Sequence, residues 1–101
     1  MVILKEKINK NELILTMVNQ LNLFLESHNR LIELAEKKNL TSAQIVAVER
    51  YAITRHYYEE CWKKSHQGQD YPYFDLQTLT KEITRDYERI EQFCQKLLNS
   101  D

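Results

Sequence analysis

Residues 12–44 read ELILTMVNQLNLFLESHNRLIELAEKKNLTSAQ, a long apolar-periodic segment followed by a short polar turn. The apolar side chains recur at alternating steps of three and four, which is the spacing of one face of an α-helix. This face consists of Ile14, Met17, Leu21, Phe24, His28, Leu31 and Ala35. Lys37 and Lys38 suit the negative end of a helix dipole. The pattern therefore predicts a helix over residues 12–38.

The polar turn carries a complete start signal for a second helix. Thr41 followed three residues later by Gln44 forms a capping box, and Leu40 with Ile45 supplies a hydrophobic staple. The connection should be two or three residues long, which makes the two helices antiparallel neighbours. The second helix is predicted over residues 42–66. Its main apolar face carries Ala47, Val48, Tyr51, Ala52, Tyr58 and Trp62.

A second apolar strip runs along the same predicted helix. It consists of Val46, Ile53 and Tyr57, and it lies roughly 150° from the main face at 100° per residue. Two apolar faces on one helix indicate contacts on two sides. We therefore expect a homodimer that buries this strip or part of the first helix.

The third helix follows the main loop, residues 67–73, which holds Gly68 and Pro72, the one Gly and the one Pro of the chain. Asp75 is predicted to cap a helix over residues 75–98, with Phe74 as its staple residue. Its stripe consists of Leu76, Leu79, Ile83, Tyr87, Ile90, Cys94 and Leu97. Residues 1–11 either extend the first helix or form a short extra helical element. The fold class is thus all-α, an antiparallel three-helix bundle with one domain over residues 1–101.

Composition excludes several other classes of protein. A single Gly and a single Pro in 101 residues argue against a turn-rich β-sandwich or barrel. Lys and Arg number 14 against 15 Asp and Glu, so the net charge is −1, which argues against a protein built to coat nucleic acid or an anionic membrane. No run of apolar residues is long enough to span a bilayer, and the start lacks the features of a signal peptide. A cytoplasmic location is expected.

The cysteines and histidines predict no metal or cofactor site. Cys61 and Cys94 are too few for a disulfide framework and are expected to be free, buried thiols. His28, His56 and His66 show no zinc-ligand spacing with each other or with the cysteines. The sequence also lacks a Gly-rich phosphate loop and a nucleophile elbow. We expect neither a bound cofactor nor a metal.

Three polar residues interrupt the apolar stripes. His28, Arg55 and Asp86 lie on or beside the core-facing side of the first, second and third predicted helix. With a rise of about 1.5 Å per residue, all three fall at nearly the same height in an antiparallel bundle. Because an unpaired buried charge is costly, they should find partners there. We expect a core polar layer in which Arg55 pairs with Asp86, while His28 bonds to Asp86 or to a Tyr.

Residues 49–58 read ERYAITRHYY and contain an Arg and a His six residues apart. Arg50 and His56 in this string resemble the Arg–His motif of HEPN-domain ribonucleases, and Tyr58 follows the His as in some toxin members of that family. The resemblance covers nine residues of the chain. It implies metal-independent cleavage of RNA, with Arg50 and His56 meeting their copies across a dimer interface.

Surplus apolar and aromatic residues favour a binding protein over an enzyme. Aromatic residues are enriched at protein interfaces. The candidate interaction surface consists of Tyr57, Tyr71, Tyr73, Phe74, Leu23 and Leu34. The sequence favours a small non-enzymatic regulator, inhibitor or adaptor that binds another protein through a helical face. The alternatives are a HEPN-like ribonuclease and a small-molecule-binding helical bundle.

Overall fold

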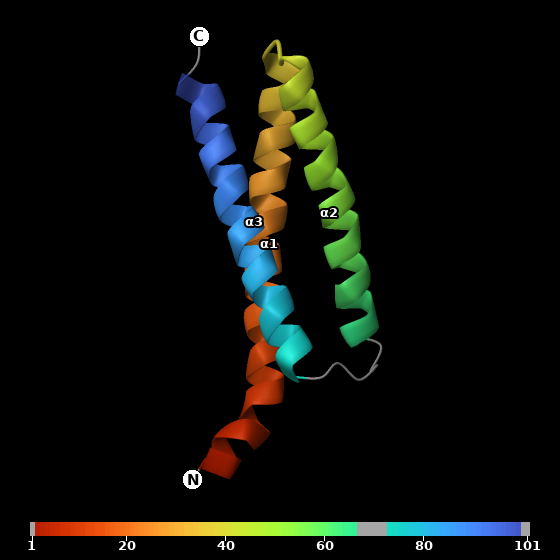
Figure 1. Cartoon of the computed structure of the whole chain (residues 1–101), viewed down its shortest axis with the longest axis vertical. Coiled ribbons are helices and arrows are strands. Elements are labelled where there is room, and N and C mark those ends of the chain that lie inside the picture. The colour runs from red at the N-terminus through yellow and green to blue at the C-terminus, as the bar shows by residue number, and fades with distance from the viewer. Residues whose placement is uncertain (1, 67–72, 100–101) are drawn as a thin grey trace.

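A computed structural model describes the backbone of residues 2–66 and 73–99 and the side chains of residues 12–64 and 76–99. It contains three helices, α1 (Val2–Lys37), α2 (Ser42–His66) and α3 (Tyr73–Asn99), and no strand within the described residues. The helices run antiparallel in sequence order (Figure 1). The predicted all-α three-helix bundle is confirmed. None of the described helices is long and apolar enough to cross a membrane.

Helix α1 begins much earlier than the apolar pattern predicts. It starts at Val2 and ends at Lys37, a length of 36 residues. Of the two alternatives for residues 1–11, extension of the first helix is the one observed for residues 2–11. The reason is local, because this segment contains no Gly or Pro to interrupt a helix.

Helix α2 has the predicted bounds, and the predicted capping box is formed. The Thr41 backbone N–H donates to Gln44 Oε1 at 2.9 Å, and the Gln44 N–H donates to Thr41 Oγ1 at 3.2 Å. These bonds satisfy backbone groups that the first turn of a helix leaves unpaired. The connection is longer than predicted, because residues 38–41 lie between the two helices. Its first residue still bonds backward, from Lys38 N–H to the Leu34 carbonyl at 3.0 Å.

Helix α3 begins at Tyr73, two residues before its predicted start, and ends at Asn99. The prediction that Asp75 is the capping residue is therefore wrong, since Asp75 lies inside the first turn. Pro72 precedes the helix in the sequence, and proline commonly stands at or just before a helix start. The staple contact predicted for Phe74 lies outside the described side chains.

The hydrophobic core is made chiefly by α1 and α3. The buried apolar residues are Met17, Leu21, Phe24 and Leu31 of α1; Leu76, Leu79, Ile83, Ile90, Cys94 and Leu97 of α3; and Tyr58 and Cys61 of α2. This set confirms most of the predicted stripes of the first and third helices. Cys61 and Cys94 are free and buried, as predicted.

Helix α2 lies at one side of the α1–α3 pair and packs much less closely. The contact between α2 and α1 is less extensive than the contact between α3 and α1. Only two of the described apolar side chains of α2 are buried. Of its predicted main face, Tyr58 is buried, Ala52 is exposed and the others are half-buried. The radius of gyration is 16.1 Å, against about 13 Å for a compact domain of this length. The elongated shape leaves long helix faces exposed to solvent (Figure 1).

Candidate functional site

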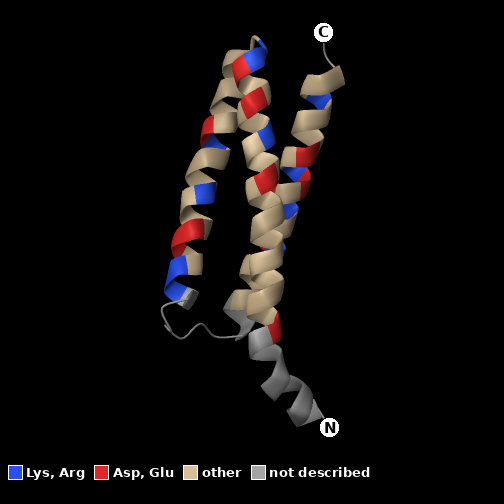
Figure 2. Ribbon diagram, turned by 180° about the vertical axis from the view of Figure 1, so that it is seen from behind, with Lys and Arg blue, Asp and Glu red and all other residues tan. Residues whose placement is uncertain are grey.

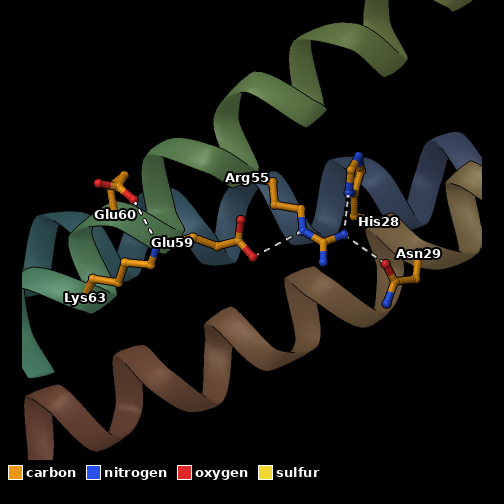
Figure 3. A network of polar contacts seen from close by, with 6 residues as sticks. All are labelled: His28, Asn29, Arg55, Glu59, Glu60 and Lys63. Atoms are coloured by element: carbon orange, nitrogen blue, oxygen red, sulfur yellow. Dashed lines mark hydrogen bonds and ion pairs between the residues drawn. The ribbon is translucent and has the colours of Figure 1, made fainter.

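The main polar cluster of the bundle is centred on Arg55 of α2, which reaches across to α1 (Figure 3). Arg55 Nη1 donates to Asn29 Oδ1 at 2.8 Å and contacts His28 Nδ1 at 3.1 Å. Its Nε lies 3.6 Å from Glu59 Oε2, one turn further along α2. The guanidinium therefore bridges the two helices while its charge is balanced at the surface.

His28 is the buried member of this cluster, with only 2% of its surface exposed. Because a guanidinium has no acceptor, the contact with Arg55 requires His28 Nδ1 to accept, which places the proton of the neutral ring on Nε2. Nε2 is buried and has no hydrogen-bond partner among the described residues. Burial and the neighbouring Arg55 charge lower the pKa of His28, and Glu59 opposes them. The ring is held in its neutral form and stacks on Phe24.

Asp86 of α3 belongs to a second cluster, which joins α3 to α2. It accepts a hydrogen bond from the Tyr58 hydroxyl at 2.5 Å, and Arg89 Nη1 lies 4.0 Å from its other oxygen. Tyr58 is buried, and its ring meets the Phe24 ring edge-on with centroids 5.3 Å apart. Burial and the bond to Asp86 raise the pKa of Tyr58 far above its ordinary value, so the hydroxyl stays protonated and donates.

The predicted polar layer is thus found in an altered form. His28 and Arg55 are in contact, but the predicted Arg55–Asp86 pair is not formed, since within the described residues Asp86 binds Tyr58 and Arg89. The heights were predicted well, but the directions of the side chains were not. Arg55 faces α1, whereas Tyr58, about 60° around the helix, faces Asp86. The result is two neutralised clusters in place of one buried ion pair.

A third polar contact, which sequence reasoning missed, joins α1 to α3. The Ser27 hydroxyl, fully buried, donates to the Glu91 carboxylate, and Arg30 lies 3.2 Å from the same carboxylate. The Cys94 thiol faces the Ser27 carbonyl at 4.0 Å, and burial with the nearby Glu91 charge raises the pKa of this thiol. A Ser adjacent to the apolar stripe was the available signal, because a buried hydroxyl needs a partner.

A groove of about 320 Å³ lies between α2 and α3. Its walls are Ala43, Val46, Ala47, Arg50, Tyr51, Thr54, Asp86 and Arg89. Burial and the Asp86 charge raise the pKa of Tyr51. This volume is at the lower end of the range for small-molecule sites. The groove offers a mixed set of cationic, anionic and apolar groups.

The residues that carry the HEPN resemblance do not converge within the chain. Arg50 and His56 are both exposed on α2, about 120° apart around the helix. Tyr58 is buried, and its hydroxyl is engaged by Asp86. A phosphate at the surface of α2 therefore has Arg50 or His56 within reach in one copy of the chain, but not Tyr58.

The predicted interaction residues differ in their exposure to solvent. Tyr57 is 55% exposed, and Leu23 is 38% exposed. Leu34, by contrast, is half-buried and packs against the core, so it does not form an exposed line with Leu23. The side chains of Tyr71, Tyr73 and Phe74 lie outside the described residues.

The second apolar strip of α2 faces solvent. Val46 is 48%, Ile53 72% and Tyr57 55% exposed. We call these three residues the α2 outer face. Glu49, Arg50 and His56 flank it and are exposed as well. Acidic and basic residues are mixed on all three helices and no side gathers basic residues alone (Figure 2), so the charge pattern does not favour a polyanionic partner.

Among the described residues, no group of three or more His, Cys, Asp or Glu side chains could hold a metal ion. The chain matches no protein-family model, no curated protein and no solved structure.

Proposed function

We propose that this chain is a small, non-enzymatic protein–protein interaction module that acts as a homodimeric regulator, inhibitor or adaptor in the cytoplasm. The α2 outer face is the binding surface. The single observation that carries the proposal is the exposure of Val46, Ile53 and Tyr57 along one line of a helix. Contiguous exposed apolar residues with a charged rim are typical of protein interaction sites.

The weak packing of α2 supports the same proposal. Of the described side chains of α2, only Tyr58 and Cys61 belong to the buried apolar core, so the helix gains little from its inner face. Its outer face nevertheless carries an Ile, a Val and a Tyr, where solvent would favour polar residues. Burial against a partner would stabilise both the interface and the position of α2 on the bundle.

The experiment is affinity capture from the cells that carry the gene, with the wild-type chain and two variants as bait. Ile53→Glu places a charge in the middle of the α2 outer face, so capture of a specific protein should be lost. Leu15→Glu is the matched control, because Leu15 is 61% exposed but lies on α1. Equal capture by wild type and Ile53→Glu would contradict the proposal.

A HEPN-like ribonuclease is the second candidate, favoured by the exposure of both Arg50 and His56. In that case Arg50 would stabilise charge on the phosphate, and His56 would act on a proton of the reacting ribose. RNA cleavage by the purified chain that is abolished by Arg50→Ala or His56→Ala would favour this candidate. If the purified chain does not cleave RNA, the ribonuclease candidate is excluded and the interaction module remains the proposed function.

A further inference from the structure

We infer that the α2 outer face is covered by the α2 outer face of a second copy, packed antiparallel, with the two-fold axis passing at Ile53. This inference rests on the proposed function and names the partner: the protein that covers the α2 outer face, and that the capture experiment should recover, is a second copy of this chain. Ile53 is the most exposed large hydrophobic residue of the described chain. It also lies within one residue of the middle of α2, which spans Ser42–His66. A two-fold axis at Ile53 therefore overlaps nearly all of the helix, a length of about 37 Å.

The register that this axis imposes pairs unlike groups along both flanks. In an antiparallel pair, residues at equal distances on opposite sides of Ile53 come level, so Arg50 lies about 1.5 Å in height from Tyr57 of the second copy. Both residues lie on the same flank of the strip, at about 40° and 20° from the line through Val46. A guanidinium over a phenol ring is a favourable cation–π contact.

The opposite flank is complementary too. Glu49 and His56 lie about 60° and 80° from the line through Val46, on the other side, and they differ in height by about 1.5 Å across the axis. Glu49 of one copy therefore faces His56 of the other, and the contact occurs twice by symmetry. Glu60, which comes level with Val46, keeps its own cation, because Lys63 Nζ lies 3.3 Å from its carboxylate.

In a parallel pair the two-fold axis would run along the helices, so each flank would meet the opposite flank of the second copy, and Arg50 would lie near Glu49 of that copy. The charges therefore do not separate the two arrangements, and the cross-linking experiment below decides between them. The antiparallel arrangement leaves the rest of the bundle free. Arg55, which holds α2 to α1, reaches toward α1 (Figure 3). Tyr58, which holds α2 to α3, lies about 120° around the helix from Val46.

Cysteine cross-linking tests the register directly. A residue on the two-fold axis meets its own copy, so Ile53→Cys should form a disulfide-linked dimer in high yield under mild oxidation. The native Cys61 and Cys94 are buried and do not compete. Leu15→Cys, of similar exposure on α1, is the control for random collision and should cross-link at least tenfold less.

Two further variants separate the antiparallel from the parallel arrangement. Val46→Cys alone should not cross-link, but Val46→Cys mixed with Glu60→Cys should give a mixed dimer. Cross-linking of Val46→Cys with itself would overturn the antiparallel register. Cross-linking of Ile53→Cys no stronger than that of Leu15→Cys would overturn the homodimer.

The failure of this inference is distinguishable from failure of the proposed function. If Ile53→Cys does not cross-link, yet Ile53→Glu abolishes capture of a different protein, the α2 outer face binds a foreign partner, and only the homodimer is wrong. If neither effect is observed, both the inference and the proposed function are wrong.

Discussion

Single side chains hold the three helices in register, and Tyr58 with Asp86 is the most sharply defined pair. Asp86→Ala removes the acceptor of a buried hydroxyl, which should destabilise the fold by about 1–3 kcal/mol. Urea denaturation followed by circular dichroism measures this. Glu88→Ala is the control, because Glu88 is exposed on the same helix and its loss should change stability by less than about 0.5 kcal/mol. Equal effects of the two substitutions would show that the Tyr58–Asp86 bond contributes nothing.

His28 should make stability depend on pH. Its pKa is lowered in the folded state, whereas the unfolded chain has the ordinary value of 6.5. Below that value the unfolded state binds more protons, so the free energy of unfolding should fall as pH falls from 6.5 toward the folded-state pKa. His28→Leu should flatten the profile in this range, and His56→Gln, at an exposed site, should not. An unchanged profile in His28→Leu would contradict the assigned role of the ring.

The polar clusters show which part of a site can be read from sequence. The rise per residue gave the heights of His28, Arg55 and Asp86, and the first two do meet. The direction of Asp86 toward Tyr58 depends on how far α2 is turned about its own axis, which sequence periodicity fixes poorly when a helix has two apolar faces. The Ser27–Glu91 bond was missed because Glu91 is unremarkable in the sequence.

At the scale of elements, the turn between α1 and α2 is held by a reciprocal capping box. Thr41→Ala should therefore cost about 0.5–2 kcal/mol. Thr16→Ala is the control, because Thr16 is exposed within α1 and caps nothing. Thermal unfolding of both variants measures the difference. A melting temperature of Thr41→Ala equal to that of Thr16→Ala would mean that the cap does not stabilise α2.

The helices should also differ in local stability, and α2 should unfold locally more readily than α1 and α3. Because α1 and α3 supply most of the buried core, their central amides should exchange with solvent only through global unfolding. Amides of α2 should exchange faster, by opening of that helix alone. Hydrogen exchange followed by mass spectrometry or NMR measures this order at concentrations where the chain is monomeric. Equal protection in α2 and α3 would contradict it.

Helix spans were predictable to different degrees for physical reasons. The bounds of α2, residues 42–66, were predicted correctly. Its start is evident from the sequence because Thr41 and Gln44 form a capping box. The start of α1 was left open between two alternatives, because the apolar residues Val2, Ile3, Leu4 and Ile8 do not continue the spacing of the predicted stripe. The predicted start of α3 was two residues too late, because an acidic residue such as Asp75 is favourable both as a cap and within the first turn.

The whole molecule is an elongated α1–α3 pair to which α2 is loosely attached. The exposed apolar residues of the α2 outer face are the feature that the fold alone does not explain. Burying this face in a dimer accounts for the exposure of Ile53 and for the charges beside it. Because dimerisation follows mass action, the average mass in solution should rise with the concentration of the chain. Dimerisation should also stabilise α2.

Sedimentation equilibrium tests this most directly, with the wild-type chain, Ile53→Glu and Leu15→Glu compared at about 100 μM. We expect twice the chain mass of 12.2 kDa for the wild type and for Leu15→Glu, and the single-chain mass for Ile53→Glu. A single-chain mass for the wild type, or a dimer that Ile53→Glu leaves intact, would contradict the homodimer formed through the α2 outer face.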